Sequence, residues 1–151
     1  AYDCARQSGF PVKLGGTYLA MEGPQFSSLA ESQLYRSWGC DVIGMTNMPE
    51  AKLAREAELP YASIAMVTDY DCWRAPDEEA VVADILKVLA GNVERARSSV
   101  RQLAEALAGA ARTPSPIDTC LDGAIITAPE ARDGALLAKL DAVAGRALGR
   151  A

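Results

Sequence analysis

The chain has 151 residues, half of them apolar, and 15 lysines and arginines against 20 aspartates and glutamates give it a net charge of −5. This length and composition are typical of one globular domain rather than a disordered chain, and the acidic balance disfavours binding to nucleic acid. Because the chain contains no histidine, Ser-His-Asp and Cys-His groups and histidine metal sites are excluded, and any acid or base within it has to be a carboxylate.

Membrane spans and cysteine frameworks are also disfavoured. The longest apolar stretches, such as 62–67, are far shorter than the roughly 18 to 20 residues that a membrane-spanning helix needs. The four cysteines have the spacing of neither a metal knuckle nor a compact disulfide framework. The sequence therefore predicts a cytoplasmic protein with four free, mostly buried thiols at Cys4, Cys40, Cys72 and Cys120.

The first half of the chain alternates short strands with helices. In chain order we expect the end of a helix over 1–9, a strand over 17–21, a helix over 28–38, a strand over 41–45, a helix from Pro49 and a strand over 61–67. Ser28 and Glu31 have the spacing of a capping box, which marks the start of a helix. The composition of 61–67 is that of a strand buried on both faces.

The second half is predicted to be mainly helical. The expected segments are a long helical region from Pro76 or Asp77 to Leu107, a linker over 113–128 and an amphipathic helix over 129–149. Gly91 and Asn92 are expected to kink or split the long helix. The alternation of strands and helices favours an α/β fold with βαβ units, in which ligands gather at the carboxyl ends of the strands.

The first candidate site lies where the strand over 41–45 ends. Thr46 follows this strand and precedes a predicted helix. A hydroxyl, backbone N–H groups and the positive end of a helix dipole are then available to an anion or a sugar hydroxyl. The alternative is structural: Thr46 or Asn47 caps the helix and Met45 fills the core.

Two carboxylates follow the most apolar predicted strand. If that strand continues, Asp69 and Asp71 point to the same side. Each would then disfavour ionisation of the other, which raises one pKa of the coupled pair and leaves an acid able to donate a proton near neutral pH. The alternative is a solvated turn in which the aspartates bond to their own backbone. Neither interpretation needs a metal.

An aromatic side chain, Phe26, follows the Gly-Pro break in the third junction, residues 22–28. Phe26 is either a stacking platform for a planar ligand or a packing residue. Val82 and Leu86 share one face of the long helix, and their spacing alone indicates a core or an interface.

Three long motifs at these junctions resemble the methylthioadenosine phosphorylases of the trimeric purine nucleoside phosphorylase group. They are Glu22-Gly-Pro-Gln-Phe-Ser-Ser28 with Ala30-Glu31, Trp38-Gly-Cys-Asp-Val-Ile-Gly-Met-Thr-Asn-Met-Pro-Glu50, and Tyr61-Ala-Ser-Ile-Ala-Met-Val-Thr-Asp-Tyr-Asp-Cys-Trp73. The resemblance runs almost without gaps from about Gly15 to Leu107. It implies a three-layer phosphorylase/hydrolase-like α/β fold with a central mixed sheet, in which residues 1–151 are the C-terminal half of a single nucleoside phosphorylase domain.

The resemblance also implies that part of the enzyme is absent from this sequence. The family's N-terminal half supplies a Gly-rich phosphate loop, an Arg-His pair and part of the ribose site. We therefore expect a companion N-terminal chain or segment within a homotrimer, and no phosphorylase activity from the isolated 151-residue chain.

The reaction implied by the resemblance belongs to purine and methionine salvage. Phosphate attacks C1′ of methylthioadenosine and releases adenine and 5-methylthioribose 1-phosphate, a pentosyltransferase reaction with no metal and no organic cofactor. Asp69 lies by N7 of the purine, where a protonated carboxyl stabilises the negative charge on the departing base. Asp71 helps to bind the 6-amino group, and Thr46 contacts the phosphate.

Further substrate-binding residues follow from the same resemblance. Phe26 lines the base, Met45 packs on the ribose, Val82 and Leu86 pack on the 5′ substituent, and Ser27, Ile43 and Thr68 complete the expected set. Ser27 with Asp69 is the combination that resembles adenine recognition, because relatives that use 6-oxopurines carry Glu and Asn there. Aliphatic residues in place of a histidine favour a methylthio group over a hydroxyl by about 1 to 3 kcal/mol.

Two other functions stay open from the sequence. One is a related phosphorylase that acts on adenosine or another 6-aminopurine nucleoside. The other is a non-catalytic nucleoside-binding or assembly module that retains the base pocket without the phosphate half.

Overall fold

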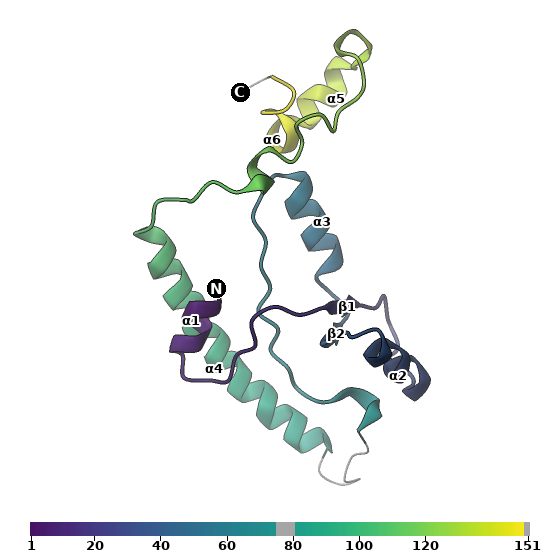
Figure 1. Ribbon diagram of the computed structural model, residues 1–151, viewed down its shortest axis with the longest axis vertical. Coiled ribbons are helices and arrows are strands. Elements are labelled where there is room, and N and C mark those ends of the chain that lie inside the picture. Colours follow the sequence, from purple (N-terminus) through teal and green to yellow (C-terminus); the bar gives the residue numbers. More distant parts are fainter. Residues whose placement is uncertain (75–80, 150–151) are drawn as a thin grey trace. The chain divides into compact units, whose positions relative to one another are not determined.

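The computed structural model describes residues 1–74 and 81–149, and side chains from residue 84 onward in the second range (Figure 1). The chain divides into two compact units, Ala1–Thr46 with Ser63–Ala111 and Asn47–Ala62 with Arg112–Ala151.

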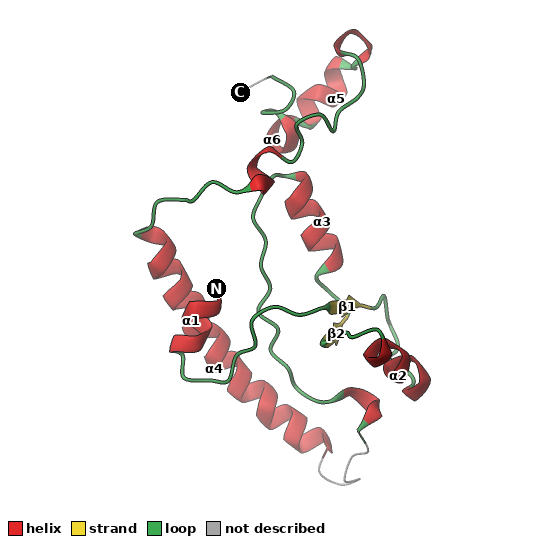
Figure 2. Cartoon of the chain, viewed as in Figure 1, coloured by secondary structure: helices red, strands yellow, loops and turns green. Residues whose placement is uncertain are grey.

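The elements of the first unit are α1 (Tyr2–Gln7), β1 (Tyr18–Ala20), α2 (Leu29–Ser37), β2 (Val42–Gly44), the 3-10 helix η1 (Asp71–Trp73) and α4 (Val81–Ala108). Its sheet is formed by β1 and β2, which run parallel in the register Tyr18↔Val42, Leu19↔Ile43 and Ala20↔Gly44. Figure 2 shows the two strands side by side with α2 next to them. Because α2 connects two parallel strands, the predicted βαβ unit is confirmed.

Helix α2 begins where the sequence predicts it. The Ser28 hydroxyl accepts a hydrogen bond from the Glu31 backbone N–H at 3.3 Å, and the Glu31 carboxylate accepts from the Ser28 N–H at 2.7 Å. This capping box satisfies two N–H groups that the first turn leaves without partners. The hydrogen bond from Ser28 also lowers the pKa of Glu31. The start of α2, which positions the residues that follow it, is therefore set locally.

Helix α4 packs against α1 in the first unit. Its packing partner α1 contributes the buried Cys4 and Ala5, and Gln102 donates a hydrogen bond to the Ser8 hydroxyl at 3.1 Å. Helix α4 is continuous from Val81 to Ala108, so of the kink or split predicted at Gly91 and Asn92, the split is wrong. Helical hydrogen bonding tolerates both residues in a helix of this length, at a modest cost in propensity.

The strand predicted over 61–67 is also wrong, because the structure has neither a strand nor a helix there. A strand forms only where a neighbour supplies its ladder of hydrogen bonds, and no strand of the described residues pairs with this segment. Ile64 and Val67 are 37% and 58% exposed. The segment has the composition of an interior strand and the exposure of a loop.

The second unit contains α3 (Met48–Glu56), η2 (Pro116–Thr119), η3 (Pro129–Ala131), α5 (Gly134–Lys139) and α6 (Asp141–Ala144). The single helix predicted over 129–149 is thus divided into three pieces. The division occurs because Arg132 is extended and the Asp133 side chain caps α5 by accepting from the Leu136 N–H at 2.9 Å. The predicted linker over 113–128 includes η2, which Ser115 caps.

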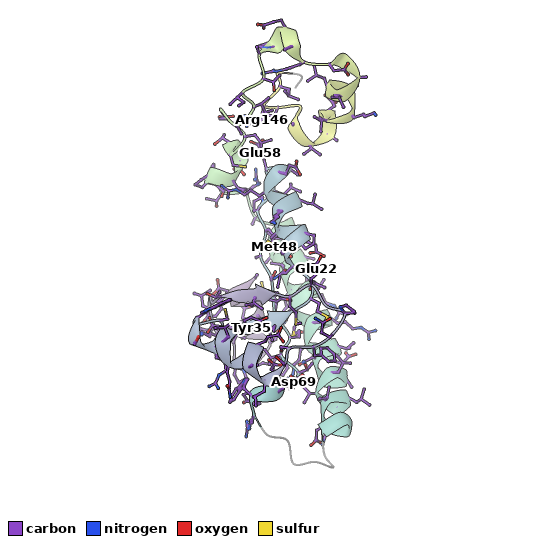
Figure 3. All side chains as sticks on the ribbon, turned by 90° about the vertical axis from the view of Figure 1, so that its right-hand side faces the viewer. Glu22, Tyr35, Met48, Glu58, Asp69 and Arg146 are labelled. Atoms are coloured by element: carbon purple, nitrogen blue, oxygen red, sulfur yellow. The ribbon has the colours of Figure 1, made fainter. Side chains whose placement is uncertain are left out.

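Arg146 anchors the C-terminal segment of the second unit. Its guanidinium donates to the two carboxylate oxygens of Glu58 at 2.6 and 2.5 Å and to Asp122 at 2.7 Å, and Figure 3 shows Arg146 beside Glu58. Leu121 also donates its N–H to Glu58 at 3.1 Å. Hydrogen bonding to Arg146 lowers the pKa of Glu58, so this carboxylate stays ionised as the acceptor.

Few side chains of the described residues are deeply buried. None is less than 2% exposed, and the buried apolar residues are Cys4, Ala5 and Ala144. The four cysteines are free as predicted, but only Cys4 is buried. None of the helices in the described ranges is long and apolar enough to cross a membrane.

Gly44 is required by the close approach of Tyr18 across the sheet. A Cβ on Gly44 would lie 1.9 Å from the Tyr18 hydroxyl oxygen and 2.8 Å from Cζ. We expect Gly44→Ala to displace the Tyr18 ring and lower the free energy of unfolding by about 1 to 3 kcal/mol, measured by urea denaturation.

Gly91→Ala is the matched control for this substitution. Gly91 lies in α4, and a Cβ there meets nothing within 4 Å, so this change should raise the free energy of unfolding by about 0.5 to 1 kcal/mol. Equal urea midpoints for Gly44→Ala and the unsubstituted chain would contradict the steric role of Tyr18.

Candidate functional site

The carboxyl ends of β1 and β2 lie next to each other because the strands are parallel. The pairing continues one residue further, where the Met21 N–H donates to the Gly44 carbonyl at 2.9 Å. From this edge β1 leads into the loop 22–28 and β2 leads into Met45 and Thr46. The first and third candidate junctions are therefore brought to the same edge of the sheet.

Met45 lies against the loop that follows β1. A Cβ on Gly23 would be 3.0 Å from the Met45 sulfur, and Gly23 has a φ of +74°. Glycine is required there twice, for the space that Met45 occupies and for the left-handed backbone. Met45 is 38% exposed, so it covers the loop at the strand ends rather than filling a core.

The capping alternative for Thr46 and Asn47 is met only in part. Asn47 occupies the N-cap position of α3 with a φ of 83°, but its side chain makes no capping hydrogen bond. Its Oδ1 accepts from the Tyr61 hydroxyl at 2.5 Å instead. Thr46 is exposed, two residues after the end of β2.

Ser27 connects the loop 22–28 to the aspartate segment. Its side chain is only 8% exposed, and its hydroxyl oxygen lies 3.0 and 2.9 Å from Oδ1 and Oδ2 of Asp71. The Cys72 thiol donates to the Ser27 carbonyl at 3.3 Å. Three hydrogen-bond contacts therefore join this loop to the start of η1, 44 residues further along the chain.

Asp69 forms the turn that one of the two sequence interpretations describes. Its Oδ1 accepts from the Asp71 backbone N–H at 2.9 Å, and its Oδ2 accepts from the Thr68 hydroxyl at 2.7 Å. An aspartate that bonds the backbone two residues on is an Asx-turn. The side chain is exposed, and Figure 3 shows it in the segment before η1.

Asp71 has different surroundings from Asp69. Burial opposes its ionisation, but hydrogen bonds from Ser32, Ser27 and Cys72 outweigh this effect and lower the pKa of Asp71 below its usual 3.8. The rise in pKa expected for one member of the pair is therefore not found at Asp71. These donors hold Asp71 as an ionised acceptor.

No side-chain hydrogen bond is recorded for the remaining predicted residues among those that the structure describes. Ile43, at the centre of β2, lines a cavity of about 60 Å³ together with Ser32, Asp71 and Trp73. Phe26 is 84% exposed and Leu86, on α4, is 59% exposed. Val82 is in α4, but its side chain lies outside the described residues. The hydrogen bonds among the described candidates join Ser27, Thr68, Asp69 and Asp71.

Two buried polar residues near the site were not identified from the sequence. Asn92 of α4 is 5% exposed, donates to the Val67 carbonyl at 3.1 Å and accepts from Arg95 at 3.3 Å. It fixes the backbone two residues before Asp69. Ser32 of α2 is 2% exposed and hydrogen-bonds to Asp71. Its position four residues after the capping Ser28, on the same helix face, was the available signal.

No group of three or more Cys, Asp or Glu side chains in the described residues is arranged to hold a metal ion. The chemistry that this arrangement offers is that of two carboxylates in different surroundings, one in a turn and open to solvent, the other held by hydroxyl and thiol donors. Such a pair can donate a proton from one member and accept a hydrogen bond with the other.

Comparison with known proteins shows a clear family relationship. The sequence model of the phosphorylase superfamily matches residues 1–105. The S-methyl-5′-thioadenosine phosphorylase of Cereibacter sphaeroides is 59% identical over 148 residues, which are 97% of this chain and 51% of that protein. The enzyme of the same name from Bradyrhizobium diazoefficiens is 58% identical over 147 residues, covering 95% of this chain and 50% of the relative.

Solved structures give the same result. The crystal structure of a methylthioadenosine phosphorylase from an Antarctic soil metagenomic library has a TM-score of 0.83 and 41% identity, covering 94% of this chain and 50% of that one. Methylthioadenosine phosphorylase from Schistosoma mansoni in complex with adenine has a TM-score of 0.65 and 32% identity, covering 79% and 47%. The chain thus spans about half the length of the relatives that it matches.

The lowered pKa of Asp71 predicts how stability depends on pH. A depressed folded-state pKa contributes stability that is present above the unfolded value of 3.8 and is lost as the pH falls through the folded value. The Asp71→Asn variant lacks this contribution. The difference in free energy of unfolding between the unsubstituted chain and Asp71→Asn should therefore shrink as the pH is lowered from about 6 to about 3, measured by urea denaturation.

Ser27→Ala is the companion variant for this measurement. It keeps the carboxylate but removes a donor, so the pKa of Asp71 should rise and the acid loss of stability should become smaller. A difference between Asp71→Asn and the unsubstituted chain that does not change with pH would show that Asp71 is not held ionised by these donors.

Proposed function

This chain belongs to the phosphorylase superfamily, and we propose that it supplies the purine-binding part of an enzyme that converts 5′-methylthioadenosine and phosphate to adenine and 5-methylthioribose 1-phosphate. The observation that carries this proposal is the pair of unlike carboxylates, Asp69 in an exposed turn and Asp71 held ionised by Ser27 and Ser32. The names of the relatives support the same reaction.

The two carboxylates have complementary roles in this reaction. Phosphate forms a bond to C1′ while the bond from C1′ to N9 breaks, and its electron pair goes to the purine. Asp69, in its protonated form, donates a proton to N7 and neutralises the departing base. Asp71 accepts a hydrogen bond from the 6-amino group. A 6-oxo group would place its acceptor oxygen against the acceptor carboxylate of Asp71, so binding of a 6-oxopurine is disfavoured.

The other candidate residues complete the proposed substrate site. Thr46, exposed after β2, contacts the phosphate, and Met45 packs on the ribose. Phe26 is available to the base because 84% of it is exposed. Val82 and Leu86 pack on the 5′-methylthio group, with Ile43 and Thr68 nearby in the site. Phosphate is the co-substrate, and the reaction uses neither a metal nor an organic cofactor.

A companion segment is part of the proposal. The relatives are about twice as long as this chain, and we propose that an additional N-terminal segment supplies the phosphate loop and further strands, within a cytoplasmic homotrimer. The exposed apolar residues of α4, among them Val100 at 65% and Leu107 at 64%, support a covering segment. The isolated chain is then expected to be inactive.

The proposed function is tested with a hybrid enzyme. In this hybrid, the present chain replaces the matching 51% of the Cereibacter sphaeroides relative, to which it is 59% identical. We expect the hybrid to release adenine from methylthioadenosine only when phosphate is present. Asp69→Asn should lower its kcat by about 10²- to 10⁴-fold, because the variant has no acid to protonate the base.

Asp3→Asn is the control for charge. Asp3 lies at an exposed position of α1, and its substitution should leave the turnover of the hybrid unchanged. The proposed function is wrong if an assembled hybrid releases no adenine. If it binds adenine without turnover, the chain is instead a nucleoside-binding module.

Substrate choice at the 5′ position is tested at Leu86. Leu86→Asn in the hybrid should reduce the preference for methylthioadenosine over adenosine by about tenfold, because an amide cannot replace the apolar contact with the methylthio group. Leu107→Asn makes the same substitution on the same helix at similar exposure, 64% against 59%, and should leave the preference unchanged. If the two variants change the preference equally, Leu86 does not contact the 5′ substituent. If the unsubstituted hybrid turns over adenosine faster than methylthioadenosine, the adenosine phosphorylase alternative is favoured.

A further inference from the structure

Ser32 is a buried hydroxyl in an otherwise exposed helix. It lies in the second turn of α2 and is 2% exposed, whereas the apolar Leu29 and Leu34 of the same helix are 50% and 46% exposed. Burying a hydroxyl costs free energy unless it finds a partner. Ser32 and the Asp71 carboxylate line the same cavity of about 60 Å³, and hydrogen bonding from Ser32 contributes to the lowered pKa of Asp71. Helix α2 therefore turns a polar group, not an apolar one, toward η1.

A second contact fixes α2 against η1. The Arg36 guanidinium lies 3.8 Å from the centre of the Trp73 ring, and Arg36 is four residues after Ser32, on the same helix face. The capping box holds the first turn of α2, and the helix packs on η1. The helix that contains Ser32 is therefore held by the capping box at its first turn and by its packing on η1.

The donors around Asp71 come from three different segments. Ser27 belongs to the loop after β1 and spans both carboxylate oxygens at 3.0 and 2.9 Å, Ser32 belongs to α2, and Cys72 follows Asp71 in η1. A carboxylate has about four acceptor positions. Ser27, Ser32 and Cys72 use some of these positions and oppose rotation about the bond from Cβ to Cγ, so a ligand that donates has to use the others.

We propose that Ser32 is a positioning residue that sets the preference for 6-aminopurines, because its hydroxyl holds the Asp71 carboxylate as an oriented acceptor for the exocyclic amine. This inference rests on the proposed function. Without Ser32, the donors from Ser27 and Cys72 remain, but the carboxylate loses one of the contacts that orient it and takes up a proton more readily. A protonated carboxyl can donate to a 6-oxo group. Removing Ser32 should therefore weaken the use of 6-aminopurines and relieve the penalty on 6-oxopurines.

The test compares two nucleosides that differ only at position 6 of the purine. The measured quantity is kcat/KM for 5′-methylthioadenosine divided by kcat/KM for 5′-methylthioinosine, in the hybrid enzyme. We expect Ser32→Ala to lower this ratio by about tenfold, the effect of one hydrogen bond to a charged group. A merely structural role would lower both values of kcat/KM and leave their ratio unchanged.

Ser99→Ala is the matched control. Ser99 is also a buried helical serine, 3% exposed, but it lies in α4, and its substitution should leave the ratio unchanged. In the Asp71→Asn background, Ser32→Ala should have no further effect on the ratio, because residues that act through one group are not additive. If Ser32→Ala does not assemble, Ser32→Cys keeps the size with a weaker donor and should give an intermediate ratio.

The outcomes separate the two proposals. An unsubstituted hybrid that assembles but releases no adenine contradicts the proposed function, and the role of Ser32 fails with it. An active hybrid whose ratio is the same with Ser32→Ala, or with Ser32→Cys where the alanine variant does not assemble, contradicts only the role of Ser32. A drop of equal size in the Asp71→Asn background also overturns that role, since Ser32 would then act by another route.

Discussion

The Asp71 carboxylate is the acceptor on which the arrangement of this site depends. Two regions that are far apart in the sequence meet there. One is the loop after β1 with the helix α2 that follows it, through Ser27 and Ser32, and the other is η1, which contains Asp71 itself. Apolar packing contributes little at this point, since no described side chain is less than 2% exposed. A partly buried negative charge has to be matched by donors. The need of this carboxylate for hydrogen-bond donors therefore orders the loop, α2 and η1 around it.

Asp69 and Asp71 show how two identical side chains two residues apart acquire different chemistry. The Asx-turn at Asp69 uses the Asp71 backbone N–H, and with a φ of 57° at Asp71 the chain changes direction there. The Asp71 side chain is directed at the donors from Ser27 and Ser32, while Asp69 stays exposed. Had the strand continued, both carboxylates would share one environment and one coupled titration. The turn separates their surroundings, which is the condition for one acid and one acceptor in the same site.

The predictions that succeed concern elements that are set mainly by residues close together in the sequence. The Ser28 and Glu31 capping box, the helix that follows it and the parallel strands that flank it are all found. The strand over 61–67 was predicted from composition, but strand formation depends on a neighbour that composition does not report. The periodicity over 129–149 predicts one helix, but it does not take account of the Asp133 side chain, which caps the start of a new helix, α5. At the site, candidate residues next to strand ends were identified, whereas Ser32 and Asn92 were missed because their roles lie in contacts with Asp71 and with the Val67 carbonyl.

The failed strand and the exposed apolar residues have one physical explanation. Residues 61–67 have the composition of an interior strand and lack a strand partner among the described residues, while Leu86, Val100 and Leu107 of α4 are each more than half exposed. Backbone and side chains that suit burial gain free energy when another segment covers them. We propose that the companion segment does both, by pairing with this backbone and by covering α4. Since Val67 is joined to Asn92 of α4 and leads directly to Thr68 and Asp69, completing the fold and placing Asp69, the proposed catalytic acid, would then be the same event.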